Sequence, residues 1–198
     1  MHNMTWHCIL SLFSICKCRL EVYSEENFGG KMFTVRDQNS NLQTMFKDED
    51  DFVPKSFKVK GRCQWILYSD ANFDGRSHIL EPGNHPIAHT WSAFGTTYTV
   101  CSARVLPPKG SKAFVIFRWP DYTGRMVTIY NSKRDLSKYF SGYFNSFIVI
   151  RGKWKLYTDT NYKGDKEIYK GKQMVELIES DSGSLFVHNK LKSIKRKK

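Results

Sequence analysis

The residues that could carry chemistry are few and widely spaced in this chain of 198 residues. His85 and His89 form an HxxxH pair, which binds zinc when both imidazoles lie on one helical face and a glutamate follows the first histidine. Here Pro86 follows instead and interrupts any helix, so the segment is predicted to be a loop without a metal. No GxSxG, GxGxxG, phosphate-binding loop or glycosidase-like carboxylate pair occurs. An enzyme is therefore not expected.

The cysteines show neither CxxC spacing nor the density of a disulfide scaffold. All of them lie in the first half of the chain: Cys8, Cys16, Cys18, Cys63 and Cys101. An odd number without paired spacing predicts free thiols in a reducing cytosol. If the chain is secreted, this argument reverses.

The N-terminus has two interpretations. Residues 6–16, WHCILSLFSIC, form an apolar run with Ser14 and Cys16 as small residues near a potential cleavage site, but no Lys or Arg precedes it. The run is too short to span a bilayer. It is either a signal peptide or an N-terminal arm that packs on a neighbour or stays mobile. We expect a cytoplasmic protein, with secretion as the alternative if residues 1–16 are cleaved.

The net charge of +12 is uneven, since residues 1–106 carry 11 Lys and Arg against 11 Asp and Glu, while residues 107–198 carry 20 against 8. A basic half attracts anionic membranes or acidic proteins, although a solvated surface is the simpler interpretation. Nucleic acid is not expected as a partner, because the recurring aromatic residues described next are assigned to cores.

One segment recurs four times in the chain, as VYSEENFGGK, LYSDANFDGR, IFRWPDYTGR and LYTDTNYKGD. Each copy fits aromatic-x4-aromatic-x-Gly, and the spacing of about 45 residues indicates duplication. Glycine is needed where a folded hairpin turns back at positive φ or lets a ring lie on the backbone, and the two aromatic rings cover that hairpin. The motif residues are Tyr23, Phe28 and Gly30; Tyr68, Phe73 and Gly75; Phe117, Tyr122 and Gly124; and Tyr157, Tyr162 and Gly164.

A second pattern closes each repeat with a serine and a short apolar strand: SFKV, SARV, SFIV and SIK. The closing serines are Ser56, Ser102, Ser146 and Ser193. Period-two alternation, as in Phe147 and Val149 against Ile148 and Ile150, predicts half-buried strands. Such a repeat fits a Greek-key unit; a propeller is not expected, since its Gly-His and Trp-Asp signatures are missing.

The segment 106–112, LPPKGSK, is the clearest linker and divides the repeats two and two. One Greek-key unit leaves an apolar sheet face uncovered, so two units pair into one sandwich. The sequence predicts an all-β fold with two β-sandwich domains, each of two Greek-key motifs. The predicted parts are an N-terminal extension at 1–18, a first domain at 19–106, a linker at 107–112 and a second domain at 113–196.

These residues resemble the βγ-crystallin family, in particular its vertebrate lens branch, over residues 19–196. The resemblance is carried by SNLQTMF from Ser40, QWILYSDANFDGR from Gln64, GNHPIAHTW from Gly83, SARVLP from Ser102 and GKWKLYTDTNYKG from Gly152. It implies buried tryptophans at Trp65, Trp91 and Trp154.

The resemblance makes calcium a candidate ligand, because some relatives bind it through a six-residue motif. This motif consists of an acidic pair, two variable residues, Ser or Thr, and the closing serine. The corresponding stretches here read DFVPKS, TYTVCS, SGYFNS and HNKLKS. Lys55 and Lys192 stand where oxygen ligands are needed, and Asp51 and Asn189 remain from the leading positions. Neither calcium nor another cofactor is expected.

Two functions remain open. The resemblance implies a non-enzymatic structural protein of the eye lens, soluble and refractive at high concentration, monomeric or dimeric, that associates with itself or with other crystallins. The alternative is a secreted or epithelial binding module whose basic C-terminal domain engages anionic lipid or an acidic protein.

Overall fold

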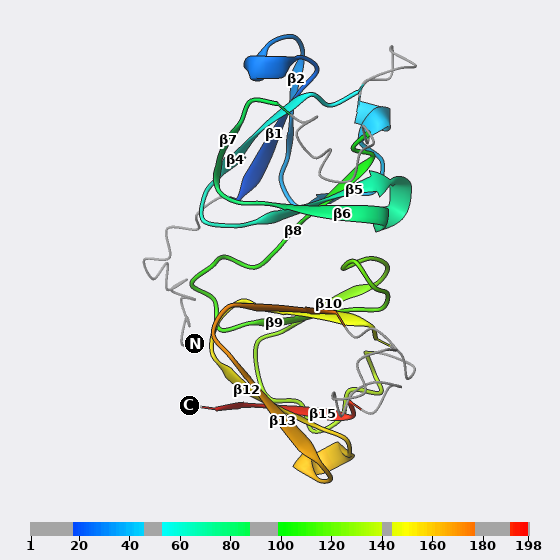
Figure 1. Ribbon diagram of the computed structural model, residues 1–198, viewed down its shortest axis with the longest axis vertical. Helices are drawn as coiled ribbons and strands as arrows, with labels where there is room; N and C mark the ends of the chain where they lie inside the picture. The colour runs from blue at the N-terminus through cyan, green and yellow to red at the C-terminus, as the bar shows by residue number, and fades with distance from the viewer. Residues whose placement is uncertain (1–17, 46–52, 88–98, 140–143, 177–190, 198) are drawn as a thin grey trace, which may run out of the picture.

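The computed structural model describes residues 18–45, 53–87, 99–139, 144–176 and 191–197, which form antiparallel strands joined by turns (Figure 1). None of the described residues belongs to a helix long and apolar enough to cross a bilayer. The first half contains β1 (Arg19–Tyr23), η1 (Glu26–Phe28), β2 (Met32–Val35), β3 (Gln38–Asn39), η2 (Leu42–Met45), β4 (Ser56–Lys60), β5 (Trp65–Asp70), η3 (Ala71–Phe73), β6 (Asp74–Leu80), β7 (Gly83–His85) and β8 (Ser102–Val105). The second half contains β9 (Phe114–Phe117), β10 (Met126–Ile129), β11 (Ser146–Val149), β12 (Lys153–Tyr157), η5 (Thr160–Tyr162), β13 (Lys166–Lys170), β14 (Gln173–Glu176) and β15 (Ser193–Lys197).

Each repeat builds most of one sheet, and repeats one, two and four each place a strand in the sheet of the other repeat of their half, while repeat three contributes an isolated bridge between Lys133 and Ile194. Sheet I has the order β2-β1-β4-β7, sheet II β3-β8-β5-β6, sheet III β10-β9-β11-β14 and sheet IV β13-β12-β15. Strand β7 belongs to repeat two but pairs with β4, while β3 of repeat one pairs with β8. Such returns to a distant neighbour are Greek-key connections. The predicted all-β fold of two Greek-key sandwiches is confirmed.

Each half has its own apolar core, formed by the facing sides of its two sheets. Leu20, Val22, Phe57, Trp65 and Leu67 fill the core between sheets I and II. The core between sheets III and IV is filled by residues that include Phe114, Ile116, Phe147, Trp154 and Leu156. Trp65 and Trp154 are therefore buried as expected, while Trp91 lies outside the described residues.

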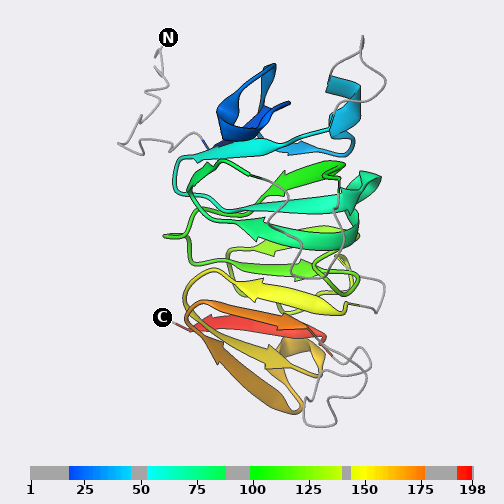
Figure 2. The same cartoon turned by 45° about the horizontal axis from the view of Figure 1, so that its top comes forward.

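A third apolar cluster joins the two halves. It consists of Ile66, Tyr68, Leu106, Ala113, Val115, Phe117, Tyr122, Ile148 and Ile150, drawn from the outer faces of sheets II and III and from the linker ends. The four sheets consequently lie one behind another in the order I, II, III, IV (Figure 2). We call this cluster the interface cluster.

The prediction that the closing strands are half-buried is wrong for β11, which is buried on both faces. In β11 the inward Phe147 and Val149 and the outward Ile148 are all buried, and Ile150 just after the strand is buried too. The reason is that sheet II covers the outer face of sheet III. A strand inside a stack of sheets is buried on both faces, whereas one in an end layer is not.

The prediction of free thiols is wrong for Cys18 and Cys63, which form a disulfide with a Cα–Cα distance of 5.7 Å. This distance is ordinary for a disulfide. The bond ties the start of β1 to the turn between β4 and β5, across a sequence separation of 45 residues. The odd number of cysteines and the lack of paired spacing gave no indication of this disulfide in the sequence. Cys101 is a free thiol, and Cys8 and Cys16 lie outside the described residues.

Candidate functional site at the interface between the halves

The recurring motif builds four folded hairpins, each covered by a pair of aromatic rings. The centroids of the two rings lie 5.7 Å apart for Tyr23 and Phe28, 5.9 Å for Tyr68 and Phe73, 5.5 Å for Phe117 and Tyr122, and 5.9 Å for Tyr157 and Tyr162. Three of the pairs meet edge to face and the fourth is tilted. These geometries suit the charge distribution of aromatic rings.

The closing serine of each repeat fastens its hairpin. In repeat one, the Phe28 N–H donates to Ser56 Oγ at 3.0 Å, and that hydroxyl donates to the Glu25 carbonyl at 2.6 Å. The same two bonds recur at the other fully buried serines, Ser102, Ser146 and Ser193. Phe28 has a φ of +68°, which a bulky residue adopts only where its surroundings hold it. The hydroxyl supplies part of that restraint.

The motif glycine follows the second aromatic residue and also has a positive φ, +69° at Gly30 and +76° at Gly75. A Cβ on Gly30 would collide with Ser24 Oγ, which accepts a hydrogen bond from the Lys31 N–H at 2.8 Å. In repeats one, two and four a side-chain hydroxyl occupies the space that a Cβ on the motif glycine would need. In repeat three the Trp119 ring occupies that space. All four motif glycines have the expected positive φ, and Gly124 also has an aromatic ring directly against it.

The hairpins of repeats two and three interlock across the interface. The buried Tyr68 hydroxyl donates to the Tyr122 carbonyl at 2.7 Å, and the Gly124 N–H donates to the Phe73 carbonyl at 3.2 Å. Burial raises the pKa of Tyr68 well above its usual value, although the Arg104 charge nearby acts in the opposite direction. Tyr68 is therefore a neutral hydrogen-bond donor at physiological pH.

Arg104 is the least expected residue of the interface, because it is a cation with only 2% of its surface exposed. Its guanidinium lies 3.8 Å from the Phe73 ring centroid and 5.1 Å from that of Tyr68, and Nη1 donates to the Gly124 carbonyl at 2.9 Å. Burial lowers the pKa of Arg104, against the opposing effect of Tyr68. The cation is stabilised by aromatic faces and a carbonyl dipole. Sequence analysis missed it, although Lys58 and Lys195 occupy the same place, two residues after the closing serine.

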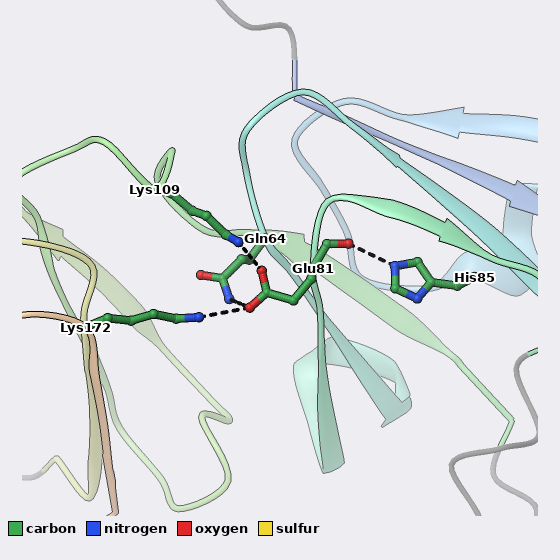
Figure 3. Close-up of polar contacts among 5 residues, drawn as sticks. All are labelled: Gln64, Glu81, His85, Lys109 and Lys172. Carbon is green, nitrogen blue, oxygen red and sulfur yellow. Dashed lines mark hydrogen bonds and ion pairs between the residues drawn. The ribbon is translucent and has the colours of Figure 1, made fainter.

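A second polar contact joins the halves at Glu81, just after β6 (Figure 3). Its carboxylate forms ion pairs with Lys109 of the linker and, at 2.9 Å, with Lys172 of the second half. Gln64 Nε2 donates to the same carboxylate at 2.8 Å. Desolvation raises the pKa of Glu81, but the hydrogen bonds from the two lysines outweigh it and hold the pKa below its usual value. One carboxylate thus connects first half, linker and second half.

The residues considered for metal binding are not brought together. His85 lies at the end of β7, where its Nε2 is 2.9 Å from the Glu81 carbonyl oxygen, and His89 lies outside the described residues. Lys55 is exposed beside its hairpin, while Lys192 pairs with Asp159 at 3.7 Å. Asp51 and Asn189 lie outside the described residues. In the part of the chain that the structure describes, no cluster of His, Cys, Asp and Glu could hold a metal.

A pocket of about 660 Å³ lies beside the linker. The Cys18–Cys63 disulfide, Pro107 and Pro108 line it from one side and Met126 and Tyr130 from the other. Leu106 of the interface cluster also lines it, so the pocket borders the interface.

Comparisons with known proteins agree on one family. The Beta/Gamma crystallin family model matches residues 19–106 and 113–196. Gamma-crystallin F of Bos taurus is 31% identical over 147 residues, which cover 74% of this chain and 80% of that protein. Gamma-crystallin 2 of Rana temporaria is 27% identical over 165 residues, 82% of this chain and 92% of that protein.

The fold has a counterpart among solved structures. Geodin, a beta-gamma crystallin from Geodia cydonium, superposes with a TM-score of 0.66 over 91% of this chain and 99% of its own. The sequence identity is 18%, so this likeness concerns the fold alone.

Proposed function

The chain belongs to the βγ-crystallin family, and from this premise we propose that it is a structural protein of the eye lens, folded and soluble at very high concentration. It is crystallin-like, structural and non-enzymatic. A role in the lens requires a protein whose halves rarely separate or unfold. Each such event exposes apolar surface, and exposed apolar surface leads to aggregation in a concentrated solution.

The observation that carries this proposal is the buried interface between the halves. Two separate sandwiches on a flexible linker would each expose an outer sheet face. Here those faces are closed by the interface cluster, the interlocked hairpins and the contacts of Glu81. The molecule then behaves as one close-packed body with little exposed apolar surface between its halves.

Two measurements test the proposal. Static light scattering of the full chain at rising concentration should show repulsion and no growth of aggregates, while Ile148→Asp, which places a charge in the interface cluster, should aggregate. In situ hybridisation should find the transcript in lens fibre cells. Aggregation of the unaltered chain would overturn the structural role at high concentration, and a transcript absent from the lens would overturn the lens assignment.

The Cys18–Cys63 disulfide favours a second candidate, a secreted structural protein, because disulfides persist mainly in oxidising compartments. Mass spectrometry of the protein from its native source tests this candidate. A mature chain that begins after residue 16, with the disulfide intact, would support secretion. An unprocessed N-terminus with Cys18 and Cys63 reduced would support the cytoplasm.

A further inference from the structure

The outer face of sheet IV is an array of six lysines. Trp154, Leu156 and Ile194 point into the core, so their neighbours along the strands point outward. The outward positions of the three strands carry Lys153, Lys155, Lys166, Lys170, Lys195 and Lys197. We call these six residues the lysine face.

The strand register places these lysines side by side. Lys153 lies opposite both Lys170 and Lys197, and Lys155 lies opposite Lys195. Ile168 takes a further outward position, while the last two, Tyr157 and Ser193, are buried beneath the hairpin that contains η5. No carboxylate stands at an outward position of these strands, and the hairpin itself carries Asp159 and Asp165. Like charges directly opposite each other in a sheet are destabilising.

The contact with Lys155 and the repulsion between the two charges lower the pKa of Lys197. Because Lys153 faces two lysines and Lys155 faces a third, the lysine face opposes folding, and neither the cores nor the interface accounts for it.

The outer face of sheet I, at the opposite end of the stack, differs from the lysine face in its charges. On the outer face of sheet I, Arg19 and Lys60 occupy the places that Lys153 and Lys197 occupy on sheet IV. The position equivalent to Lys155 is Glu21, which pairs with Arg19 at 2.9 Å. The same fold thus places a carboxylate in the middle of one end face and a lysine in the middle of the other. The basic end face is a property of repeat four.

We propose that the lysine face binds the surface of an anionic phospholipid membrane, with the part of sheet IV that the hairpin 158–165 leaves open turned toward the headgroups. With strands about 4.8 Å apart and a rise of about 3.3 Å per residue, the face measures about 10 by 13 Å. Such a face, nearly as wide as long, matches a planar distribution of charge, whereas a polyanionic chain matches a groove or a single row.

The residue types favour the same partner. Lysine presents a compact point charge suited to diffuse headgroup charge, while recognition of individual phosphates favours the planar fork of arginine. All six residues of the face are lysines. Ile168, 47% exposed among them, provides an apolar contact at the level of the headgroups.

Flotation of the full chain with vesicles tests the proposal. We expect binding to vesicles of phosphatidylserine and phosphatidylcholine, none to pure phosphatidylcholine, and loss of binding at high salt. One lysine at such a surface contributes about a fivefold factor in affinity, so Lys155→Glu, which changes the charge by two, should weaken binding about 25-fold. This variant installs the residue that sheet I has at the equivalent place, so circular dichroism should show an unchanged fold.

Lys197→Glu and Lys60→Glu form a matched pair, since both change the net charge equally and occupy equivalent positions on opposite end faces. Lys197→Glu should weaken vesicle binding about as much as Lys155→Glu, while Lys60→Glu should leave it nearly unchanged. Equal losses of vesicle binding in the two variants would overturn the proposal, because the total charge, and not the lysine face, would then determine binding. Absence of binding to the anionic vesicles would also overturn it, as would binding to heparin or duplex DNA that depends on Lys155 without vesicle binding.

Discussion

The buried interface predicts a stability effect that separates the stack from two independent sandwiches. Ile148 is on the outer face of sheet III and 2% exposed, and it belongs to the interface cluster only. Replacing a buried isoleucine by alanine costs 2 to 5 kcal/mol, so we expect Ile148→Ala to lower the unfolding free energy of the second half by about 3 kcal/mol. For a chain of this size the melting temperature should fall by roughly 6 to 12 °C.

The same substitution should have almost no effect when the first half is absent. In fragment 109–198 nothing from sheet II covers Ile148, so alanine there should change the unfolding free energy by less than about 0.5 kcal/mol. The neighbouring Phe147 points into the core between sheets III and IV and provides the control. Phe147→Ala should cost about 3 to 5 kcal/mol in the fragment and in the full chain alike.

Urea unfolding followed by tryptophan fluorescence and far-ultraviolet circular dichroism measures these differences. Both the full chain and the fragment should give cooperative transitions. An equal loss from Ile148→Ala in the two proteins would refute the argument, because Ile148 would then stabilise the second half from within. No loss in the full chain would show that the halves do not pack through this face.

Three further predictions concern the hairpins, the polar contact and the ligand. Ser56→Ala should lower the unfolding free energy of the first half by about 1 to 3 kcal/mol in urea titrations, since the Phe28 N–H and the Glu25 carbonyl lose their shared, fully buried hydroxyl partner, whereas alanine at the exposed Ser40 should change it by less than about 0.5 kcal/mol. Because the pKa of Glu81 is held below its usual 4.5, its ion pairs stabilise the protein above that pH and are lost as the pH falls through the lowered value. Glu81→Gln should therefore flatten the stability profile below about pH 4.5, by less than about 1 kcal/mol for so exposed a carboxylate. Calorimetric titration with calcium should give no heat of binding at micromolar concentration, because Lys55 and Lys192 replace oxygen ligands, and a micromolar dissociation constant would contradict this.

The sequence was sufficient for the hairpins, since two aromatic residues and a glycine at fixed spacing are a local pattern. It was insufficient for the role of Ser56 and its counterparts, whose partners lie about 30 residues away in the sequence. The disulfide was missed for the same reason: Cys18 and Cys63 are brought together by the pairing of β1 with β4. Contacts that depend on register follow from the fold and not from spacing.

The order of the four layers could have been predicted, however, from the outward positions of the first strand of each repeat. These positions hold Arg19 and Glu21 in repeat one and Lys153 and Lys155 in repeat four. In repeats two and three the position equivalent to Glu21 and Lys155 holds Ile66 and Val115. Sheets with apolar outer faces must be covered, so sheets II and III pack together and the charged sheets become the ends.

The charged ends also disfavour the stacking of one molecule on another. An apolar outer face on sheet I or IV would accept another molecule, and repetition of that contact would build a fibre. Instead the outer face of sheet I carries Arg19, Lys58 and Lys60 against Glu21, and sheet IV carries the lysine face. Both ends are net positive, so any two end faces that meet repel each other. The arrangement that leaves the lysine face open to an anionic surface is thus the same one that keeps concentrated molecules apart.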